Sequence, residues 1–125
     1  MIFGIGTDII EVERIKKHLK DNDALRDKLY TSAEQAYCTR GKVTVHQCYA
    51  ARFAAKEAFF KALGTGYRYG MAFREIEVLN DELGKPYVNP RGKVRAYLSE
   101  QQIKHIHLSI SHVKAMASAV VVLEK

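Results

Sequence analysis

One helix constrains the fold of this chain more than any other feature. Residues 52–61 read Arg-Phe-Ala-Ala-Lys-Glu-Ala-Phe-Phe-Lys, and Gly64-Thr-Gly follows two residues later. Alanine and long side chains favour a helix, and no helix breaker occurs before Gly64, which suits a C-terminal cap. The alanines form a smooth face on which another element can pack closely. The sequence therefore predicts a central helix from about Val45 to Leu63.

The charged residues of this helix need an explanation because the helix is otherwise apolar. Glu57 and Lys61 are four residues apart, so both lie on one side of the helix at about 100° per residue. Arg52 and Lys56 form a second pair with the same spacing. An ordinary surface ion pair, worth about 0.3–0.5 kcal/mol, explains such spacing without any function. A functional site is the alternative, and spacing alone leaves both open.

Two terminal segments and a turn resemble known sequence motifs. The chain opens Met-Ile-Phe-Gly-Ile-Gly-Thr-Asp8, has a Gly84-Lys85-Pro86 turn, and ends a strand with Ser109-Ile-Ser-His112. Together with the Arg52–Lys61 helix, these segments resemble the holo-acyl-carrier-protein synthases, whose patterns are G-I-G-x-D, R-F-A-x-K-E-A-x-x-K and S-x-S-H. The helix motif is highly specific, and the resemblance covers nearly the whole chain.

The resemblance implies a fold, an activity and an assembly. The family transfers 4′-phosphopantetheine from coenzyme A to a serine of apo acyl carrier protein, a step of fatty-acid biosynthesis. It adopts a 4′-phosphopantetheinyl transferase-like fold, in which a compact antiparallel sheet packs against one long helix. It assembles as a homotrimer with active sites between neighbouring subunits.

Length and composition indicate an ordinary globular protein. At 125 residues the chain is expected to form a single domain, 1–125, with 47% hydrophobic and 27% charged residues. Its longest apolar run near the C-terminus, 115–123, is too short to cross a bilayer, and the N-terminus lacks the pattern of a secretory signal. Cys38 and Cys48 have no metal-binding spacing, so we expect reduced thiols, no membrane association and a cytoplasmic location.

The net charge of +6 predicts an acidic partner. Nucleic acid is the default partner of a basic protein, and seven Tyr and five Phe could stack on bases. However, the positive charge is not gathered in a tail, and no basic-aromatic RNA-binding motif is present. An acidic carrier protein and a phosphorylated cofactor account for the charge equally well, so we expect no nucleic-acid partner.

The pattern of elements predicts an α+β fold. We expect strands at 2–9, 73–80 and 87–88, helices at 11–20, 31–38, 45–63 and 94–102, and a terminal hairpin formed by 106–111 and 116–123. Asp21-Asn-Asp is expected to interrupt the first helix. Gly64–Gly70 is expected to be a loop, and it contains the unusual run Tyr67-Arg-Tyr. Strands separated by helices, followed by a hairpin, favour an antiparallel sheet.

Asp8 and Glu57 are the candidate metal ligands. A carboxylate at a strand end and another on a helix can converge if the first strand packs beside the alanine-rich helix. Two carboxylates suffice for Mg²⁺, which keeps waters and takes further ligands from substrate phosphates. Without the family, an N-cap Asp8 and a solvated Glu57 explain the residues equally well. The resemblance favours the metal site because both positions match the family's ligands.

Several further residues are candidates for binding coenzyme A. A structural Lys61 would hydrogen-bond the last carbonyls of the helix and interact with the helix dipole. A functional Lys61 would neutralise the pyrophosphate of coenzyme A and assist the leaving group. Backbone amides of the loop that begins at Gly64 could approach phosphate oxygens. Arg52 and Lys85 are further possible phosphate contacts. The resemblance adds His107 and Ser109, because in the family their strand lines the coenzyme A site. A Ser–His hydrolase on the strand 106–111 is the weaker interpretation, since no G-x-S-x-G elbow is present.

The first helix carries a basic face. Its residues Arg14, Lys17, His18 and Lys20 could form an ordinary solvated surface, but they follow closely after Asp8. In the family this helix docks the acidic recognition helix of acyl carrier protein, and opposite charges at such a rim speed encounter.

Together these features predict a magnesium-dependent phosphopantetheinyl transferase. Glu57 or a metal-bound water would deprotonate the carrier serine, and Lys61 would help adenosine 3′,5′-bisphosphate to leave. A nucleic-acid-binding module and a metal-dependent hydrolase of coenzyme A are the competing interpretations.

Overall fold

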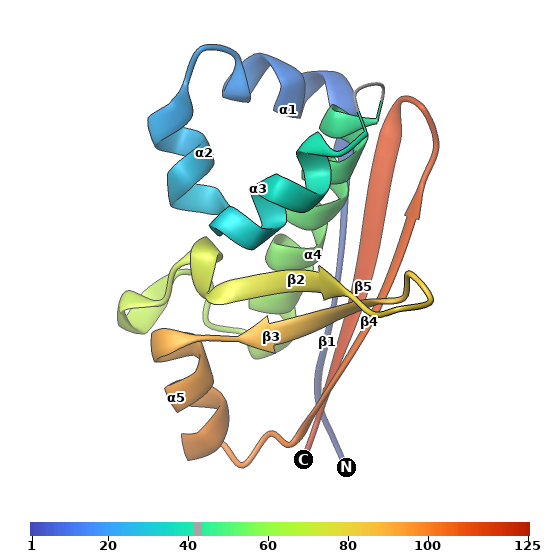
Figure 1. Cartoon of the computed structure of the whole chain (residues 1–125). Coiled ribbons are helices and arrows are strands. Elements are labelled where there is room, and N and C mark those ends of the chain that lie inside the picture. The colour runs from blue at the N-terminus through green and yellow to red at the C-terminus, as the bar shows by residue number, and fades with distance from the viewer. Residues whose placement is uncertain (42–43) are drawn as a thin grey trace.

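The helix α4 (Val45–Leu63) runs through the middle of the molecule, as the sequence predicted (Figure 1). This computed structural model describes residues 1–41 and 44–125. Twelve of the nineteen residues of α4 are buried, so the helix is covered on nearly every side. It ends at Gly64, which adopts a left-handed conformation with φ 77° and donates its N–H to the carbonyl of Phe60 at 3.0 Å.

A three-stranded antiparallel sheet packs against one side of α4 (Figure 1). Its strands, in spatial order, are β1 (Ile2–Glu11), β5 (Met116–Glu124) and β4 (His105–His112). Alternate residues of β5, from Ala117 to Leu123, are buried, whereas Val120 between them is exposed. The sheet therefore has one face on the core and one face on the outside of the chain.

A separate two-stranded sheet crosses α4 on another side. It pairs β2 (Ile76–Asn80) with β3 (Pro86–Pro90), and α5 (Gly92–Glu100) follows β3. The expected strand 73–80 is shorter, because Phe73–Glu75 forms a 3-10 helix, η2. The antiparallel strands thus form two sheets around one long helix. The α+β class with antiparallel pairing is confirmed.

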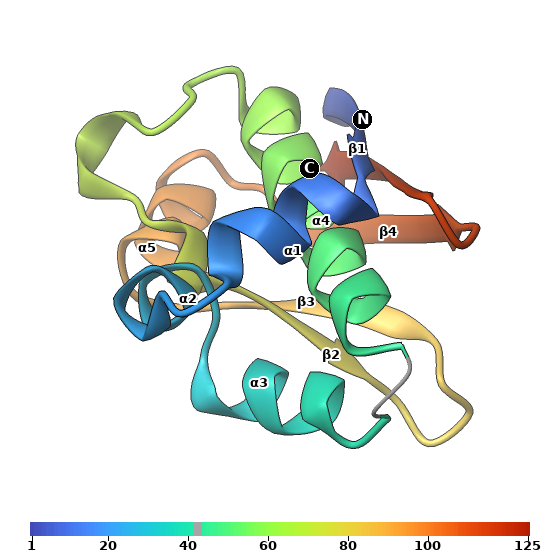
Figure 2. The same cartoon turned by 90° about the horizontal axis from the view of Figure 1, so that it is seen from above.

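Three short helices precede α4 in the chain, and two of them, the first and the third, pack against it (Figures 1 and 2). They are α1 (Val12–Leu19), α2 (Asp23–Leu29) and α3 (Ser32–Thr39). The helix α2 was not predicted, because Asp21-Asn-Asp reads as a break in the sequence. Asn22 is instead a helix N-cap, and its side-chain oxygen accepts the N–H of Leu25 at 3.1 Å. None of the helices in the described residues is both long and apolar enough to cross a membrane.

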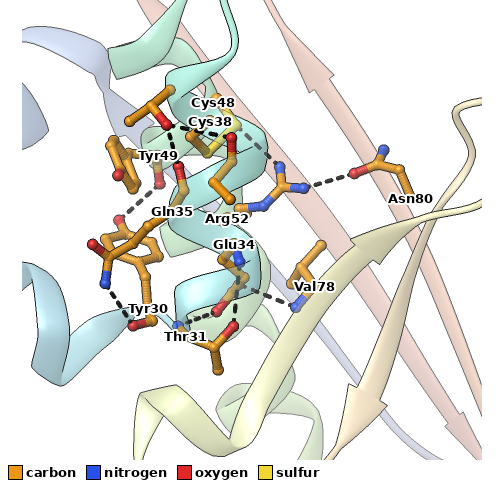
Figure 3. The surroundings of a disulfide bond; sticks show 12 residues. Tyr30, Thr31, Glu34, Gln35, Cys38, Cys48, Tyr49, Arg52, Val78 and Asn80 are labelled. Carbon is orange, nitrogen blue, oxygen red and sulfur yellow. Dashed lines mark hydrogen bonds between the residues drawn. A yellow bond between two sulfur atoms is a disulfide. The ribbon is translucent and has the colours of Figure 1, made fainter.

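A disulfide bond joins α3 to α4, which corrects the expectation of two reduced thiols (Figure 3). Cys38 and Cys48 have Cα atoms 5.4 Å apart. A capping box at Thr31 and Glu34 begins α3 and directs its last turn toward the first turns of α4. The pairing depends on this packing of two helices, which the spacing of cysteines in the sequence does not reveal.

Candidate active site

The first strand approaches α4 closely because two of its residues are glycines. A Cβ atom added at Gly4 would collide with the carbonyl of Ala62, and one at Gly6 would collide with the carbonyl of Ala58. Only a strand with glycines here, facing a helix with alanines, permits this contact. The close packing brings the next inward-facing residue of β1, Asp8, beside the last turns of α4.

Asp8 and Glu57 line one cavity of about 230 Å³, as the proposed metal site requires. Arg14 and His18 of α1 line the same cavity, together with apolar residues that include Phe53. Asp8 is a half-buried strand residue, so it does not serve as the N-cap of α1, which is Glu11. The cavity is thus bordered by two carboxylates and two basic groups.

Lys61 joins this group by contacting Asp8. Its Nζ donates to the carbonyl of Thr7 at 3.0 Å and lies 3.2 Å from Asp8 Oδ1. The Lys61 side chain is 56% exposed and that of Asp8 is 17% exposed, so the ammonium remains accessible to an anionic substrate. Lys61 of α4 therefore pairs with Asp8 of β1, instead of forming the expected surface pair with Glu57.

Glu57 has a different partner, Tyr67, which the sequence analysis did not assign to the site. The Tyr67 hydroxyl donates a hydrogen bond to Glu57 Oε1 at 2.7 Å. Burial, the hydrogen bond and the nearby carboxylate charges raise the pKa of Tyr67 to about 12, so the hydroxyl keeps its proton at neutral pH. The unusual Tyr67-Arg-Tyr run was the only signal in the sequence, and nothing in its spacing points to Glu57.

The donor set of the cavity fits Mg²⁺. One oxygen of each carboxylate, Asp8 Oδ1 and Glu57 Oε1, accepts a hydrogen bond from a protein side chain. Within residues 1–41 and 44–125, no protein group donates a hydrogen bond to the other oxygen, Asp8 Oδ2 or Glu57 Oε2. The described part of the chain has no cluster of three or more His, Cys, Asp or Glu residues suited to a metal. Two carboxylates match an ion that keeps several waters and binds substrate phosphates.

Arg52 lies apart from this cavity. Its buried guanidinium donates to Asn80 Oδ1 at 2.6 Å and to Cys48 Sγ at 3.3 Å (Figure 3). The guanidinium also lies 4.6 Å from the ring centroid of Tyr37. Burial lowers its pKa, although nearby Glu34 opposes that shift. Arg52 lines a second cavity of about 370 Å³, which shares no lining residue with the first.

The other expected coenzyme A contacts are also separated within one chain. Gly64 caps α4 one turn beyond Lys61, and Lys85 is exposed in the turn between β2 and β3. His107 and Ser109 are exposed on β4, and His107 Nε2 lies 2.9 Å from Glu124 Oε1. The structure therefore unites Asp8, Glu57 and Lys61, with Gly64 nearby, and leaves the remaining contacts on other surfaces.

Lys56, next to Glu57, is a buried structural residue. Its Nζ lies 2.8 Å from Glu34 Oε1 and donates to the carbonyls of Phe73 and Ile76 at 3.0 and 2.7 Å. Burial lowers the pKa of Lys56 to about 8, and its partner Glu34 acts against the shift. These contacts tie α4 to α3 and to the start of β2.

Comparison with known proteins identifies the family. A model of the 4′-phosphopantetheinyl transferase superfamily matches residues 4–122. The chain belongs to this superfamily. Among curated superfamily members, the holo-[acyl-carrier-protein] synthase of Trichlorobacter lovleyi is 50% identical, over 99% of this chain and 98% of its own. That of Halothermothrix orenii is 48% identical over 100% and 99%.

Solved structures of superfamily members show the same fold. The holo-[acyl-carrier-protein] synthase of Neisseria meningitidis superposes with a TM-score of 0.91, at 39% identity and over 100% of both chains. The Bacillus anthracis enzyme, solved in complex with CoA (3′,5′-ADP), has a TM-score of 0.82, at 42% identity over 99% of this chain and 97% of that one. The resemblance seen in the sequence motifs is confirmed.

Proposed function

We propose that this chain transfers 4′-phosphopantetheine from coenzyme A to a serine of apo acyl carrier protein, in fatty-acid biosynthesis. Membership of the superfamily and the names of its relatives support this activity. The observation that carries the residue assignment is that Asp8 and Glu57 line one cavity and that Lys61 contacts Asp8. We assign residues 1–125 to one catalytic domain, since the buried hydrophobic residues form one cluster.

Asp8 and Glu57 would hold Mg²⁺, which would neutralise the pyrophosphate of coenzyme A and polarise the phosphorus under attack. Either Glu57 or a metal-bound water would accept the proton of the carrier serine. The serine oxygen then bonds to the phosphorus on the pantetheine side, and the pyrophosphate bond breaks. Lys61 stabilises the negative charge on the departing adenosine 3′,5′-bisphosphate.

We further propose that a second copy of the chain completes the site, as in a homotrimer. The candidate contacts Arg52, His107 and Ser109 lie away from Glu57 within one chain. The outer face of the three-stranded sheet supports the proposal: Ile5 and Ile9 are 66% and 65% exposed there, and Ser109 occupies the same outer face. Light scattering should give about three times the monomer mass; a fully active monomer would contradict the shared site.

The acidic carrier protein is proposed to dock on α1. Arg14, Lys17 and His18 of this helix and Lys20, which caps its C-terminal end, are all exposed. Arg14 and His18 also line the cavity of Asp8 and Glu57, so a protein bound along α1 would bring its serine to the candidate active site.

A cytoplasmic location remains our expectation, and it implies that the Cys38–Cys48 disulfide meets cellular reductants.

Intact-mass analysis of an apo carrier protein tests the function. The carrier is incubated with this protein, coenzyme A and Mg²⁺, and the mass should increase by one phosphopantetheinyl group. Cleavage of coenzyme A with an unmodified carrier would instead favour a hydrolase. Omission of Mg²⁺, with a chelator present, should abolish the mass increase.

A further inference from the structure

The loop that follows α4 turns back toward the helix and brings Tyr67 to Glu57. Gly64 and Gly66 both adopt positive φ values, 77° and 62°, which a side chain would disfavour. The chain therefore reverses within a few residues. As a result the Tyr67 hydroxyl reaches Glu57 Oε1 at 2.7 Å, although the two residues are ten positions apart.

The ring of Tyr67 is held by an aromatic cluster. It meets the ring of Phe60 edge-on, with centroids 5.0 Å apart, and the ring of Phe73 at 4.9 Å. Phe73 in turn stacks on Phe53 at 5.6 Å. Although 54% of Tyr67 is exposed, packing on one side restricts where its hydroxyl can lie.

This cluster is anchored by the buried Lys56. The Lys56 ammonium donates to the main-chain carbonyl of Phe73 at 3.0 Å and to that of Ile76 at 2.7 Å. Lys56 and Glu57 are adjacent in α4. The same turn of the helix therefore contacts Phe73 through Lys56 and Tyr67 through Glu57. One of the rings that packs against Tyr67 is thus held by a buried side chain of the core.

We propose that Tyr67 is a positioning residue for the metal site, an inference that rests on the proposed function. A free glutamate side chain rotates about three bonds, and binding a cation would have to freeze that motion. The Tyr67 hydroxyl occupies Oε1 and restrains the carboxylate before the cation arrives, while Oε2 stays free to bind it. Partners of this kind orient metal-binding carboxylates and strengthen metal binding.

Each of the two carboxylates thus has one oxygen that accepts a hydrogen bond from a side chain. Lys61 contacts Asp8 Oδ1, and Tyr67 contacts Glu57 Oε1. The partner of Asp8 is a charged ammonium group, whereas the partner of Glu57 is a neutral hydroxyl group on a ring that packs against other aromatic rings. Tyr67 therefore orients Glu57 without cancelling its negative charge, which the cation requires.

Binding of Mn²⁺, measured by electron paramagnetic resonance on the protein without coenzyme A, tests the role. Tyr67→Phe removes only the hydroxyl and keeps the ring in its cluster. We expect it to weaken Mn²⁺ binding about tenfold, in the range found for partners of metal ligands. Tyr69→Phe is the matched control: Tyr69 lies in the same loop but stacks on Tyr97, at 5.6 Å, and should bind Mn²⁺ like the wild type.

The Mg²⁺ dependence of carrier modification supplies a second measurement. In Tyr67→Phe the Mg²⁺ concentration for half-maximal rate should rise about tenfold, while the rate at saturating Mg²⁺ recovers. A residue that only supported the fold would not shift the Mg²⁺ dependence. Unchanged or tighter Mn²⁺ binding in Tyr67→Phe would overturn the proposal.

Glu57→Gln separates this proposal from the metal site itself. If Glu57→Gln weakens Mn²⁺ binding and Tyr67→Phe does not, the positioning role is wrong and the proposed function stands. If neither variant affects Mn²⁺ binding, Glu57 is not a ligand, and both the metal assignment and the positioning role fall.

Discussion

Lys61 shows how the setting of a single residue separates a structural role from a catalytic one. A lysine in the last turn of a helix commonly serves the helix end. Here the ammonium instead contacts Asp8 and Thr7 of another element and stays accessible. This position suits a group that meets the charge developing on a departing phosphate.

Lys61→Met should lower kcat more than it weakens coenzyme A binding. The methionine keeps most of the length of the side chain but cannot stabilise the charge that develops in the transition state. Such a loss costs on the order of a hundredfold in kcat. Single-turnover kinetics and calorimetric titration of coenzyme A separate the two quantities. If affinity falls and kcat is unchanged, Lys61 is a phosphate anchor only.

At this scale the sequence predicted the charged residues of the site better than their contacts. The family motifs singled out Asp8, Glu57 and Lys61, and the structure unites them at the packing of β1 on α4. Tyr67 escaped prediction because its contact depends on a loop reversal at Gly64 and Gly66, which spacing along the chain does not encode.

Among the elements, α4 is held in place by a buried charge pair. Lys56 and Glu34 are both fully buried, and Glu34 also accepts the backbone N–H groups of Thr31 and Val78. Removing one member of such a pair leaves the other charge buried without its partner.

Lys56→Met should therefore lower the free energy of unfolding by about 3–5 kcal/mol. Lys61→Met is the matched control on the same helix; because Lys61 is exposed, its loss should cost only about 0–1 kcal/mol. Urea-induced unfolding followed by circular dichroism measures both. Equal stability of the two variants would refute the role of the buried pair.

The disulfide between α3 and α4 should also stabilise the fold. It closes a loop of ten-residue separation, and the loop-closure model assigns such a short loop about 2–3 kcal/mol. Dithiothreitol should therefore lower the melting temperature of the wild type. The double variant Cys38→Ser and Cys48→Ser should have a lower melting temperature than the oxidised wild type, and dithiothreitol should not change it. A wild type whose melting temperature does not change with dithiothreitol under denaturing conditions would contradict this.

The elements themselves were largely predictable, with physical reasons for the exceptions. The bounds of α4 followed from helix-forming residues and a glycine cap, and the capping box at Thr31 located α3. The helix α2 was missed because Asn22 caps a helix in a segment that reads as a break. The division into two sheets was not predicted, since strand pairing depends on contacts distant in sequence.

For the molecule as a whole, the distribution of charge favours a protein partner on α1. Arg14, Lys17 and His18 of α1 and Lys20 at its end are exposed, and Arg14 and His18 line the cavity, whereas Val12, Ile15 and Leu19 are buried in the core. Rim charges of this kind act mainly through the association rate and its dependence on salt.

Arg14→Glu combined with Lys17→Glu should weaken carrier binding and spare coenzyme A. The wild type should lose affinity for the carrier as ionic strength rises, and the double variant should respond less to salt. Surface plasmon resonance at several salt concentrations measures this. As a control, duplex DNA should not displace the carrier at physiological salt; a variant that loses nucleic-acid binding but retains its carrier KM would favour the nucleic-acid module.

The most direct test of the central claim, that Asp8 and Glu57 form one metal-dependent site, is the rate of carrier modification by intact mass in matched variants. Asp8→Asn and Glu57→Gln preserve shape but remove a charge needed by Mg²⁺, and each should reduce the rate on the order of a hundredfold or more. Glu13→Gln, an exposed carboxylate on α1, should match the wild type. Near-normal modification by Asp8→Asn or Glu57→Gln at low Mg²⁺ would contradict the claim.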